Sequence, residues 1–111
     1  MGNKTTSNQA RSYDDTWLVV PLYNEGPVIT EVIENARESF RNVVCVDDGS
    51  SDGSADLAEA AGATVLRHAF NLGQGAALQT GIEFAASQPG MNYLVTFDAD
   101  GQHQVSDAMA M

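Results

Sequence analysis

The chain has 111 residues, of which 15 are acidic and 5 are basic, so its formal net charge at pH 7 is −10. The length allows one domain at most, and a hydrophobic content of 43 % is typical of a globular chain rather than a disordered one. Such an acidic chain is a poor partner for nucleic acid and for anionic lipid, because both are bound through Lys and Arg.

Residues 1–15 are predicted to form a disordered N-terminal tail, and residues 16–111 a single domain that is truncated, because the chain stops without a closing turn. The tail lacks the apolar stretch of a secretory signal, and no apolar run reaches the ~18 residues that a membrane span requires. The one cysteine, Cys45, lies in an apolar run, so we assign it to the core. It excludes an internal disulfide and suits a reducing compartment, so we expect a cytoplasmic protein.

From Trp17 onward, short apolar runs alternate with segments in which apolar residues recur every three or four positions. The runs predict strands, of which those at 17–20 and 43–46 have the pattern of strands buried on both faces, and the periodic segments predict helices. In chain order, the predicted elements are a strand over 17–20, a helix over 27–40, a strand over 43–46, a helix from Asp52 or Ser54 to Ala61, a strand over 64–66, a helix over 75–86, a strand over 93–97 and a helix that begins at Ser106.

This alternation predicts an α/β fold, namely a Rossmann-like parallel sheet of about four strands with helices on both faces. Right-handed crossovers and the usual doubly wound arrangement place the strands in the order 3-2-1-4, with an apolar edge exposed at the fourth strand. Ligands of such sheets bind outside the carboxyl ends of the strands, which here means the crevice between the first and fourth strands.

Polar residues and glycines follow the carboxyl end of every predicted strand, so they gather at one edge of the sheet. They are Tyr23, Asn24 and Glu25 after the first strand, Asp47 and Asp48 after the second, Asn71, Gly73 and Gly75 after the third, and Asp98, Asp100, Gln102 and His103 after the fourth. We therefore expect the binding site of the protein to be formed by members of this set.

Asp98 and Asp100 are two positions apart, so on an extended segment their carboxylates point the same way and repel each other. A divalent cation removes that repulsion, and oxygen ligands suit Mg²⁺ or Mn²⁺, which bind through carboxylates together with substrate phosphates. The sequence has no Lys or Arg after Arg67, so either this half of the chain needs a cation or a basic partner segment lies elsewhere. The alternative is a turn in which both aspartates cap backbone N–H groups.

The loop Asp47–Gly53 begins with two adjacent carboxylates, more than a strand-to-helix turn needs. We assign Asp52 to the N-cap of the following helix. A carboxylate at the strand end, from Asp47 or Asp48, is expected to accept hydrogen bonds from a base N–H or from ribose hydroxyls, as acidic residues do in other mononucleotide-binding folds.

Gly73 and Gly75 do not form a dinucleotide fingerprint, because Leu78 stands where a third glycine is needed and the pair follows the third strand. No P-loop motif occurs in the chain either. The two glycines either let the backbone approach a ligand or serve as plain turn residues. We assign His68 to an exposed position without a role, whereas His103 is either a site residue or a residue that supports the site.

Four segments together resemble the start of a family 2 glycosyltransferase, a family with the GT-A fold. They are 20–25 (VPLYNE), 46–53 (VDDGSSDG), 71–76 (NLGQGA) and 98–103 (DADGQH). The amino-acid sequences of the second and fourth segments are most similar to the branch that moves a sugar from a nucleotide donor onto a polyprenyl or dolichyl phosphate. The resemblance implies metal-assisted sugar transfer with inversion at the anomeric carbon.

By position in these motifs, the resemblance implies a nucleotide-sugar site beside a metal site. Tyr23 would lie against the base, and Asp48 would hydrogen-bond the base or the ribose. The implied donor-binding set is Pro21, Tyr23, Asn24, Glu25, Asp47, Asp48, Gly73, Gly75, Asp98 and Ala99, with Asp98 and Asp100 as the catalytic pair and Asp98, Asp100 and Gln102 as ligands of Mg²⁺ or Mn²⁺. The metal would offset charge on the leaving diphosphate.

The chain departs from the polyprenyl-phosphate branch at Gln104, where proline is frequent, and at Gln74, where a basic residue is frequent. The acceptor-side half of the family is expected beyond Met111, so the resemblance covers a donor-binding half. Two alternatives stay open: a family member with a saccharide acceptor, and a nucleotide-sugar-binding module without catalysis. A nucleotidyltransferase is disfavoured, because no glycine-rich loop with a basic residue follows the first strand. A lipid acceptor would place the protein at the cytoplasmic face of a membrane.

Overall fold

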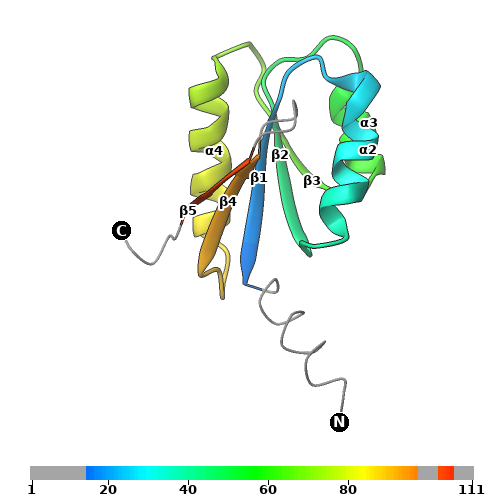
Figure 1. Ribbon diagram of the computed structural model, residues 1–111. Coiled ribbons are helices and arrows are strands. Elements are labelled where there is room, and N and C mark those ends of the chain that lie inside the picture. Colours follow the sequence, from blue (N-terminus) through cyan, green and yellow to red (C-terminus); the bar gives the residue numbers. More distant parts are fainter. Residues whose placement is uncertain (1–14, 98–102, 107–111) are drawn as a thin grey trace.

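The computed structural model describes residues 15–97 and 103–106, which form one sheet with helices on both faces (Figure 1). In chain order, the elements are β1 (Thr16–Leu22), α2 (Gly26–Arg37), β2 (Asn42–Asp47), α3 (Ser54–Ala60), β3 (Thr64–Arg67), α4 (Gln74–Ala86), β4 (Tyr93–Phe97) and β5 (His103–Ser106). In Figure 1, α4 lies on one side of the sheet, and α2 and α3 lie together on the other. The predicted α/β class is confirmed.

The strands lie in the order β3-β2-β1-β4-β5. β1 pairs in parallel with both β2 and β4, and β2 pairs in parallel with β3, which confirms the predicted order 3-2-1-4. Parallel neighbours require a crossover connection, and the helices of this chain provide it. The segments that follow β1, β2 and β3 therefore leave the sheet at the same edge.

Ser106 does not begin a helix, as was predicted, but ends a strand. Residues His103–Ser106 form β5, which pairs antiparallel with β4 and places His103 opposite Phe97. This pairing satisfies backbone groups at the β4 edge that was expected to be exposed. The rest of the predicted helix, residues 107–111, and residues 1–14 of the predicted tail lie outside the described residues.

Several element ends differ from the prediction; β1, for example, runs on to Leu22 and so includes Pro21, which was assigned to the following loop. Helix α2 ends at Arg37, short of the predicted end at Phe40, although Phe40 still packs against the core. Asp15, which was assigned to the tail, accepts hydrogen bonds from the backbone N–H groups of Asn92 and Tyr93, at 2.9 and 3.2 Å. None of the helices in the described ranges is both long and apolar enough to cross a membrane.

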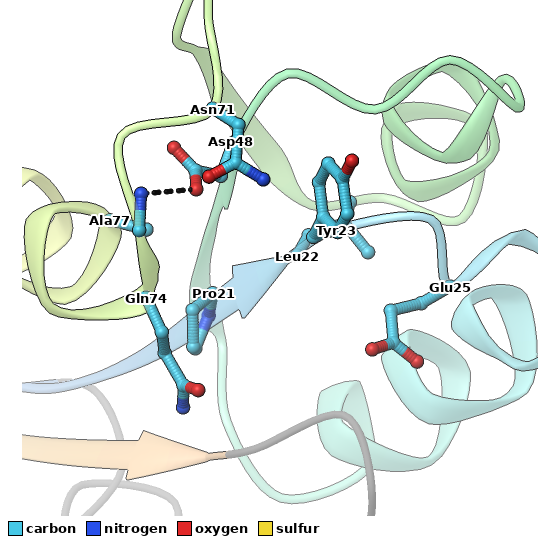
Figure 2. A pocket seen from close by; sticks show the side chains of 9 residues that line it. Pro21, Leu22, Tyr23, Glu25, Asp48, Asn71, Gln74 and Ala77 are labelled. Carbon is cyan, nitrogen blue, oxygen red and sulfur yellow. Dashed lines mark hydrogen bonds between the residues drawn. The ribbon is translucent and has the colours of Figure 1, made fainter.

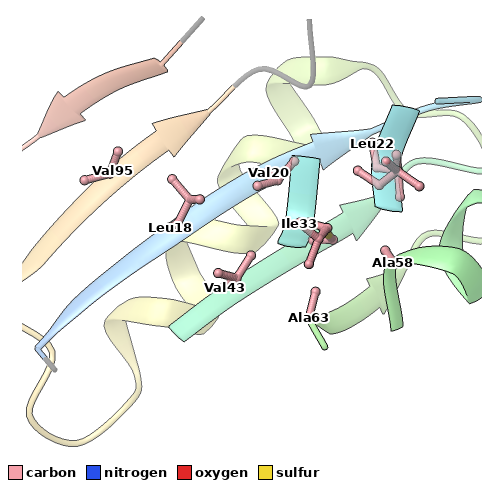
Figure 3. Close-up of a cluster of buried hydrophobic side chains, with 10 residues drawn as sticks. Leu18, Val20, Leu22, Ile33, Val43, Ala58, Ala63 and Val95 are labelled. Atoms are coloured by element: carbon pink, nitrogen blue, oxygen red, sulfur yellow. The ribbon is translucent and has the colours of Figure 1, made fainter. Parts of the chain in front are cut away.

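The core is divided between the two faces of the sheet, because side chains alternate along each strand. Leu18, Val20 and Leu22 of β1 pack with Ile29 and Ile33 of α2 (Figure 3). Residues between them in β1, such as Val19, pack on the α4 side. Full burial of one such side chain contributes about 1.5–3 kcal/mol to folding.

Cys45 is fully buried in β2. Burial raises the pKa of its thiol to about 12, because the thiolate is desolvated and the nearby Asp47 carboxylate adds a like charge. The thiol is therefore protonated at neutral pH, in agreement with its assignment to the core.

Candidate functional site

A cavity of about 270 Å³ opens at the carboxyl edge of the parallel strands, beside the start of α4. It is lined by Pro21, Leu22, Tyr23, Glu25, Asp48, Asn71, Gly73, Gln74 and Ala77 (Figure 2). Figure 2 shows that Asp48, Tyr23 and Gln74 come from three different segments around the end of β1. The structure thus brings together Pro21, Tyr23, Glu25, Asp48 and Gly73 of the predicted donor-binding set.

The Asp48 carboxylate is the most strongly held group of the cavity. Asp48 is only 3 % exposed, and its Oδ1 accepts hydrogen bonds from His68 Nδ1 at 2.8 Å and from the Leu72 N–H at 2.9 Å. Its Oδ2 accepts the Gly73 N–H at 2.8 Å, the bond drawn as a dashed line in Figure 2. Burial raises the pKa of this carboxyl, but the bonds from His68, Leu72 and Gly73 outweigh that effect and lower it below its usual value. Asp48 is therefore ionised at neutral pH.

Gly49 lets the loop before α4 reach the Asp48 carboxylate. It has a φ of +85°, a left-handed conformation that favours glycine. A Cβ at Gly49 would lie 2.8 Å from the backbone N of Asn71 and 2.9 Å from the carbonyl carbon of Phe70. Residues 70–73 can therefore cross the end of β2 only over a residue without a side chain.

Asn24 fastens two loops to each other and does not line the cavity. Its φ is +51°, and its Oδ1 accepts the Ser51 N–H at 2.9 Å. In return, the Asn24 N–H donates to Ser50 Oγ at 2.8 Å. The loop after β1 is in this way joined to the loop after β2 on the α2–α3 side of the sheet edge.

Asp52 does not occupy the predicted N-cap of α3, because that position is taken by Gly53 with a φ of +82°. Asp52 instead accepts hydrogen bonds from the N–H of Ser54 at 3.0 Å and from the N–H of Gly26, the first residue of α2, at 3.1 Å. Ser54 Oγ donates to the same carboxylate and accepts the N–H of Glu25. The hydrogen bond from the Ser54 hydroxyl is the largest cause of a lowered pKa at Asp52.

Asp47 is the last residue of β2, and the hydrogen bond from the Asp48 N–H to the Leu22 carbonyl extends the pairing by one residue, so the two side chains alternate between the faces of the sheet. Asp47 Oδ2 accepts the Ser50 N–H at 3.2 Å, and Oδ1 has no hydrogen-bond partner within the described part of the chain. Asp47 lines a second cavity, of about 380 Å³, between the start of α3 and the end of β3. Of the two adjacent carboxylates, Asp48 alone lines the cavity of Figure 2. Gly75, also in the predicted donor set, lies in α4 and is not part of that lining.

His68 contributes to the site although the sequence interpretation left it exposed and without a role. Its side chain is only 12 % exposed, with Nδ1 on Asp48 and Nε2 2.9 Å from Thr80 Oγ1. Strand register could have found it, because β2 and β3 are parallel with Asp47 opposite Arg67. The residues that directly follow the two strands, Asp48 and His68, are then expected to lie beside each other.

The predicted metal ligands Asp98, Asp100 and Gln102, with Ala99, lie outside the described residues. Strand β4 runs parallel to β1, so its last residue, Phe97, lies at the same sheet edge as the cavity. Within residues 15–97 and 103–106, no group of three or more His, Cys, Asp or Glu side chains could hold a metal ion. His103 lies in β5, opposite Phe97.

Comparison with known proteins shows the family of the chain. A family model described as glycosyl transferase family 2 matches residues 17–108. The chain is 43 % identical over 95 residues to an uncharacterised protein of Methanocaldococcus jannaschii, an alignment that covers 85 % of this chain and 39 % of that protein. It is 33 % identical over 109 residues to a protein of Methanococcus voltae named UDP-N-acetylglucosamine–dolichyl-phosphate N-acetylglucosaminyltransferase, covering 82 % of this chain and 43 % of that one.

Among solved structures, the chain is similar to glucosyl-3-phosphoglycerate synthase of Mycobacterium tuberculosis in complex with Mn²⁺, UDP and glucosyl-3-phosphoglycerate. The TM-score is 0.62 at 26 % identity, and the match covers 81 % of this chain and 35 % of that chain. The chain therefore spans less than half the length of each of these relatives.

Proposed function

The chain belongs to glycosyltransferase family 2, and from that premise we propose that the whole protein moves a sugar from a UDP- or GDP-sugar to a polyprenyl phosphate, with inversion at the anomeric carbon. The name of the Methanococcus voltae relative supports a lipid phosphate as acceptor. Because such an acceptor is a lipid, the proposal places the transfer at a membrane surface.

The observation on which the proposal most depends is the buried, ionised carboxylate of Asp48 in the cavity. An ionised carboxylate only accepts hydrogen bonds, so it selects ligands that donate. Uracil donates through a ring N–H, as does guanine. Tyr23 is 47 % exposed beside the cavity and offers an aromatic face on which a base stacks.

We propose that the diphosphate of the donor lies toward the start of α4 and the segment that follows β4. Gln74 is the first residue of α4 and lines the cavity, and the N-terminal end of a helix favours negative charge. The described cavity lining contains neither Lys nor Arg, so the phosphates need another counterion. We assign that role to Mg²⁺ or Mn²⁺ held by Asp98, Asp100 and Gln102, whose oxygens suit either ion. The ion would offset charge on the leaving diphosphate.

Calorimetric titration of the intact protein with UDP and with GDP, with and without Mn²⁺ or Mg²⁺, tests the donor site. We expect one of the two nucleotides to bind more tightly when the metal is present, and Asp100→Ala to abolish that dependence on metal. Glu34→Ala, which removes an exposed carboxylate of α2, is the matched control. If Asp100→Ala binds nucleotide and metal as the parent does, the metal-site assignment is wrong.

Transfer of a labelled sugar from its nucleotide donor tests the acceptor. We expect label in the lipid fraction when undecaprenyl or dolichyl phosphate is supplied, and none without acceptor. Label found only on a supplied saccharide would assign the protein to a saccharide acceptor instead. Donor binding without transfer to either acceptor would leave a nucleotide-sugar-binding module.

A further inference from the structure

His68 connects the cavity carboxylate to helix α4. Its Nδ1 donates to Asp48 Oδ1 at 2.8 Å, because an ionised carboxylate has no proton to give, and its Nε2 lies 2.9 Å from Thr80 Oγ1. The backbone N–H of His68 donates to the carbonyl of Asp47 at 2.8 Å. The imidazole is thus held between the end of β2 and the second turn of α4.

The hydrogen bonds to Asp48 leave acceptor capacity on one oxygen. Oδ1 accepts two bonds, from His68 and from the Leu72 N–H, which is the capacity of a carboxylate oxygen. From the described residues, Oδ2 accepts one bond, that of the Gly73 N–H, so one further acceptor position remains on Oδ2. Since Asp48 lines the cavity, this position is available to a ligand donor.

The two oxygens of Asp48 are held by different kinds of donor. The donor to Oδ2, Gly73, is the N-cap residue of α4, and its carbonyl accepts the Ala77 N–H at 3.1 Å. The backbone donor to Oδ1, Leu72, is 61 % exposed in the loop before that helix. The terminal torsion of an aspartate is broad, so Leu72 alone would let Oδ1, and with it the carboxylate plane, turn with the loop. A third donor, anchored on α4 through Thr80, fixes that plane relative to the cavity.

We propose that His68 and Thr80 are positioning residues that set nucleobase selectivity by fixing the acceptor position of Asp48 Oδ2. The inference rests on the proposed function, in which Asp48 accepts a hydrogen bond from a ring N–H. With the plane fixed, uracil or guanine donates to Oδ2, whereas cytosine and adenine present a lone pair at the corresponding ring nitrogen and are repelled. Without His68 the carboxylate turns, and selectivity for the base falls while binding of the diphosphate persists.

The test compares affinities of the intact protein for UDP and CDP, and for GDP and ADP, by calorimetry with Mg²⁺ present. The members of each pair share ribose and diphosphate, so their affinity ratio isolates the base. His68→Gln places its amide nearer to Thr80 and is expected to lower the ratio about ten-fold, the effect of one hydrogen bond to a charged group. His68→Asn places its amide nitrogen at the position of Nδ1, so the ratio should stay within about three-fold of the parent.

Thr80→Val removes only the hydrogen bond between His68 Nε2 and Thr80 Oγ1. It is expected to lower the affinity ratio within each nucleotide pair about three-fold, as the loss of a weaker neutral hydrogen bond would. Its matched control is Thr64→Val in β3, since Thr64 is exposed and far from the cavity lining. If the His68 and Thr80 variants lower the affinities for both members of a pair by one common factor, the residues are merely structural and the inference fails.

Asp48→Asn separates this inference from the proposed function. If Asp48→Asn leaves the base ratio unchanged, Asp48 does not contact the base and the proposed donor site fails. If Asp48→Asn abolishes the ratio and His68→Gln preserves it, the role of His68 alone is overturned. Thermal unfolding of each variant shows which ones fold, and should His68→Gln be unfolded, His68→Asn and Thr80→Val decide the question.

Discussion

Asp47 and Asp48 are adjacent in the chain but serve two different regions of the same sheet edge. On the α2–α3 side, the loops after β1 and β2 are fastened to each other by hydrogen bonds between residues 24–26 and 50–54, and Asp47 holds one turn of that region. On the α4 side, the edge opens into a cavity, and the carboxylate of Asp48 faces it.

The difference between the regions follows from strand alternation rather than from residue chemistry. Two identical carboxylates point to opposite faces, so each lines a different cavity. Both carboxylates keep acceptor capacity, since Asp47 Oδ1 has no hydrogen-bond partner among the described residues and Asp48 Oδ2 accepts one bond. They differ in the cavity that they line: Asp48 lines the cavity of Figure 2, and Asp47 lines the second cavity beside the start of α3. Two adjacent acidic residues in one motif can therefore have two different roles.

The largest expected difference is in stability. Asp48→Ala should lower the free energy of unfolding by about 3 kcal/mol, because the donors of His68, Leu72 and Gly73 each lose an acceptor worth about 1 kcal/mol. Asp47→Ala should cost about 1 kcal/mol or less, since it accepts one hydrogen bond, from Ser50. Urea unfolding followed by circular dichroism measures both values, and equal losses would contradict the comparison.

Gly49 and Gly53 both have a left-handed backbone, and replacing each by alanine tests how closely the loop before α4 approaches the end of β2. Gly49→Ala combines backbone strain with a collision against residues 70–71, and should lower the free energy of unfolding by about 3 kcal/mol. Gly53 has a φ of +82°, and a Cβ added there would meet open space. Gly53→Ala should therefore lower the free energy of unfolding by about 1 kcal/mol, from backbone strain alone. The same unfolding experiment applies, and a Gly49→Ala protein as stable as Gly53→Ala would show that the loop before α4 is free to move.

The loss of folding stability at low pH should depend on Asp48. Its pKa is lowered in the folded state despite burial, so the unfolded chain, with an ordinary aspartate pKa of about 3.9, takes up the proton first. The ionised carboxylate therefore stabilises the fold above pH ~4, and this contribution is lost as the pH falls through the folded pKa. Asp48→Asn should lose less stability than the parent between pH 7 and pH 3, with urea unfolding at each pH as the measurement. An unchanged pH dependence would exclude Asp48 as its source.

The smallest expected effect is at Asn24. Asn24→Gly keeps the left-handed φ of +51° but removes the acceptor for the Ser51 N–H, so stability should fall by about 1 kcal/mol. Nucleotide affinity should stay within about two-fold, since Asn24 does not line the cavity. A large loss of affinity in calorimetry would instead make Asn24 a contact of the donor, as the sequence motif implied.

The fold was predictable because each buried strand is a short apolar run with turn residues on both sides. In a parallel sheet the carboxyl ends of the strands lie at one edge, so residues near those ends could be predicted to gather there. They are Pro21, Tyr23, Glu25 and Asp48. Strand β5 escaped prediction because its four residues have one apolar member and no period, and its pairing with β4 is a tertiary contact.

Parts of the site depend on contacts between distant residues, which no local pattern encodes. Alternation implies that Asp47 and Asp48 diverge, but the side that bears the cavity depends on where the loop before α4 crosses β2. His68 gains its role from residues 20 and 12 positions away. Asp52 looked like a local helix cap, and its bond to Gly26 spans 26 positions.

The central claim is that Asp48, and not Asp47, binds the nucleoside. The most direct test is the affinity of Asp48→Asn and of Asp47→Asn for UDP or GDP, measured by calorimetry with Mg²⁺ on the intact protein. Both changes preserve side-chain size, but the amide nitrogen of Asp48→Asn cannot accept the hydrogen bonds that the carboxylate accepts, so thermal unfolding first checks that the variant is folded. We expect Asp48→Asn to weaken binding at least ten-fold, as loss of a hydrogen bond to a charged acceptor does, and Asp47→Asn to stay within about two-fold. Equal losses, or a larger loss for Asp47→Asn, would contradict the account.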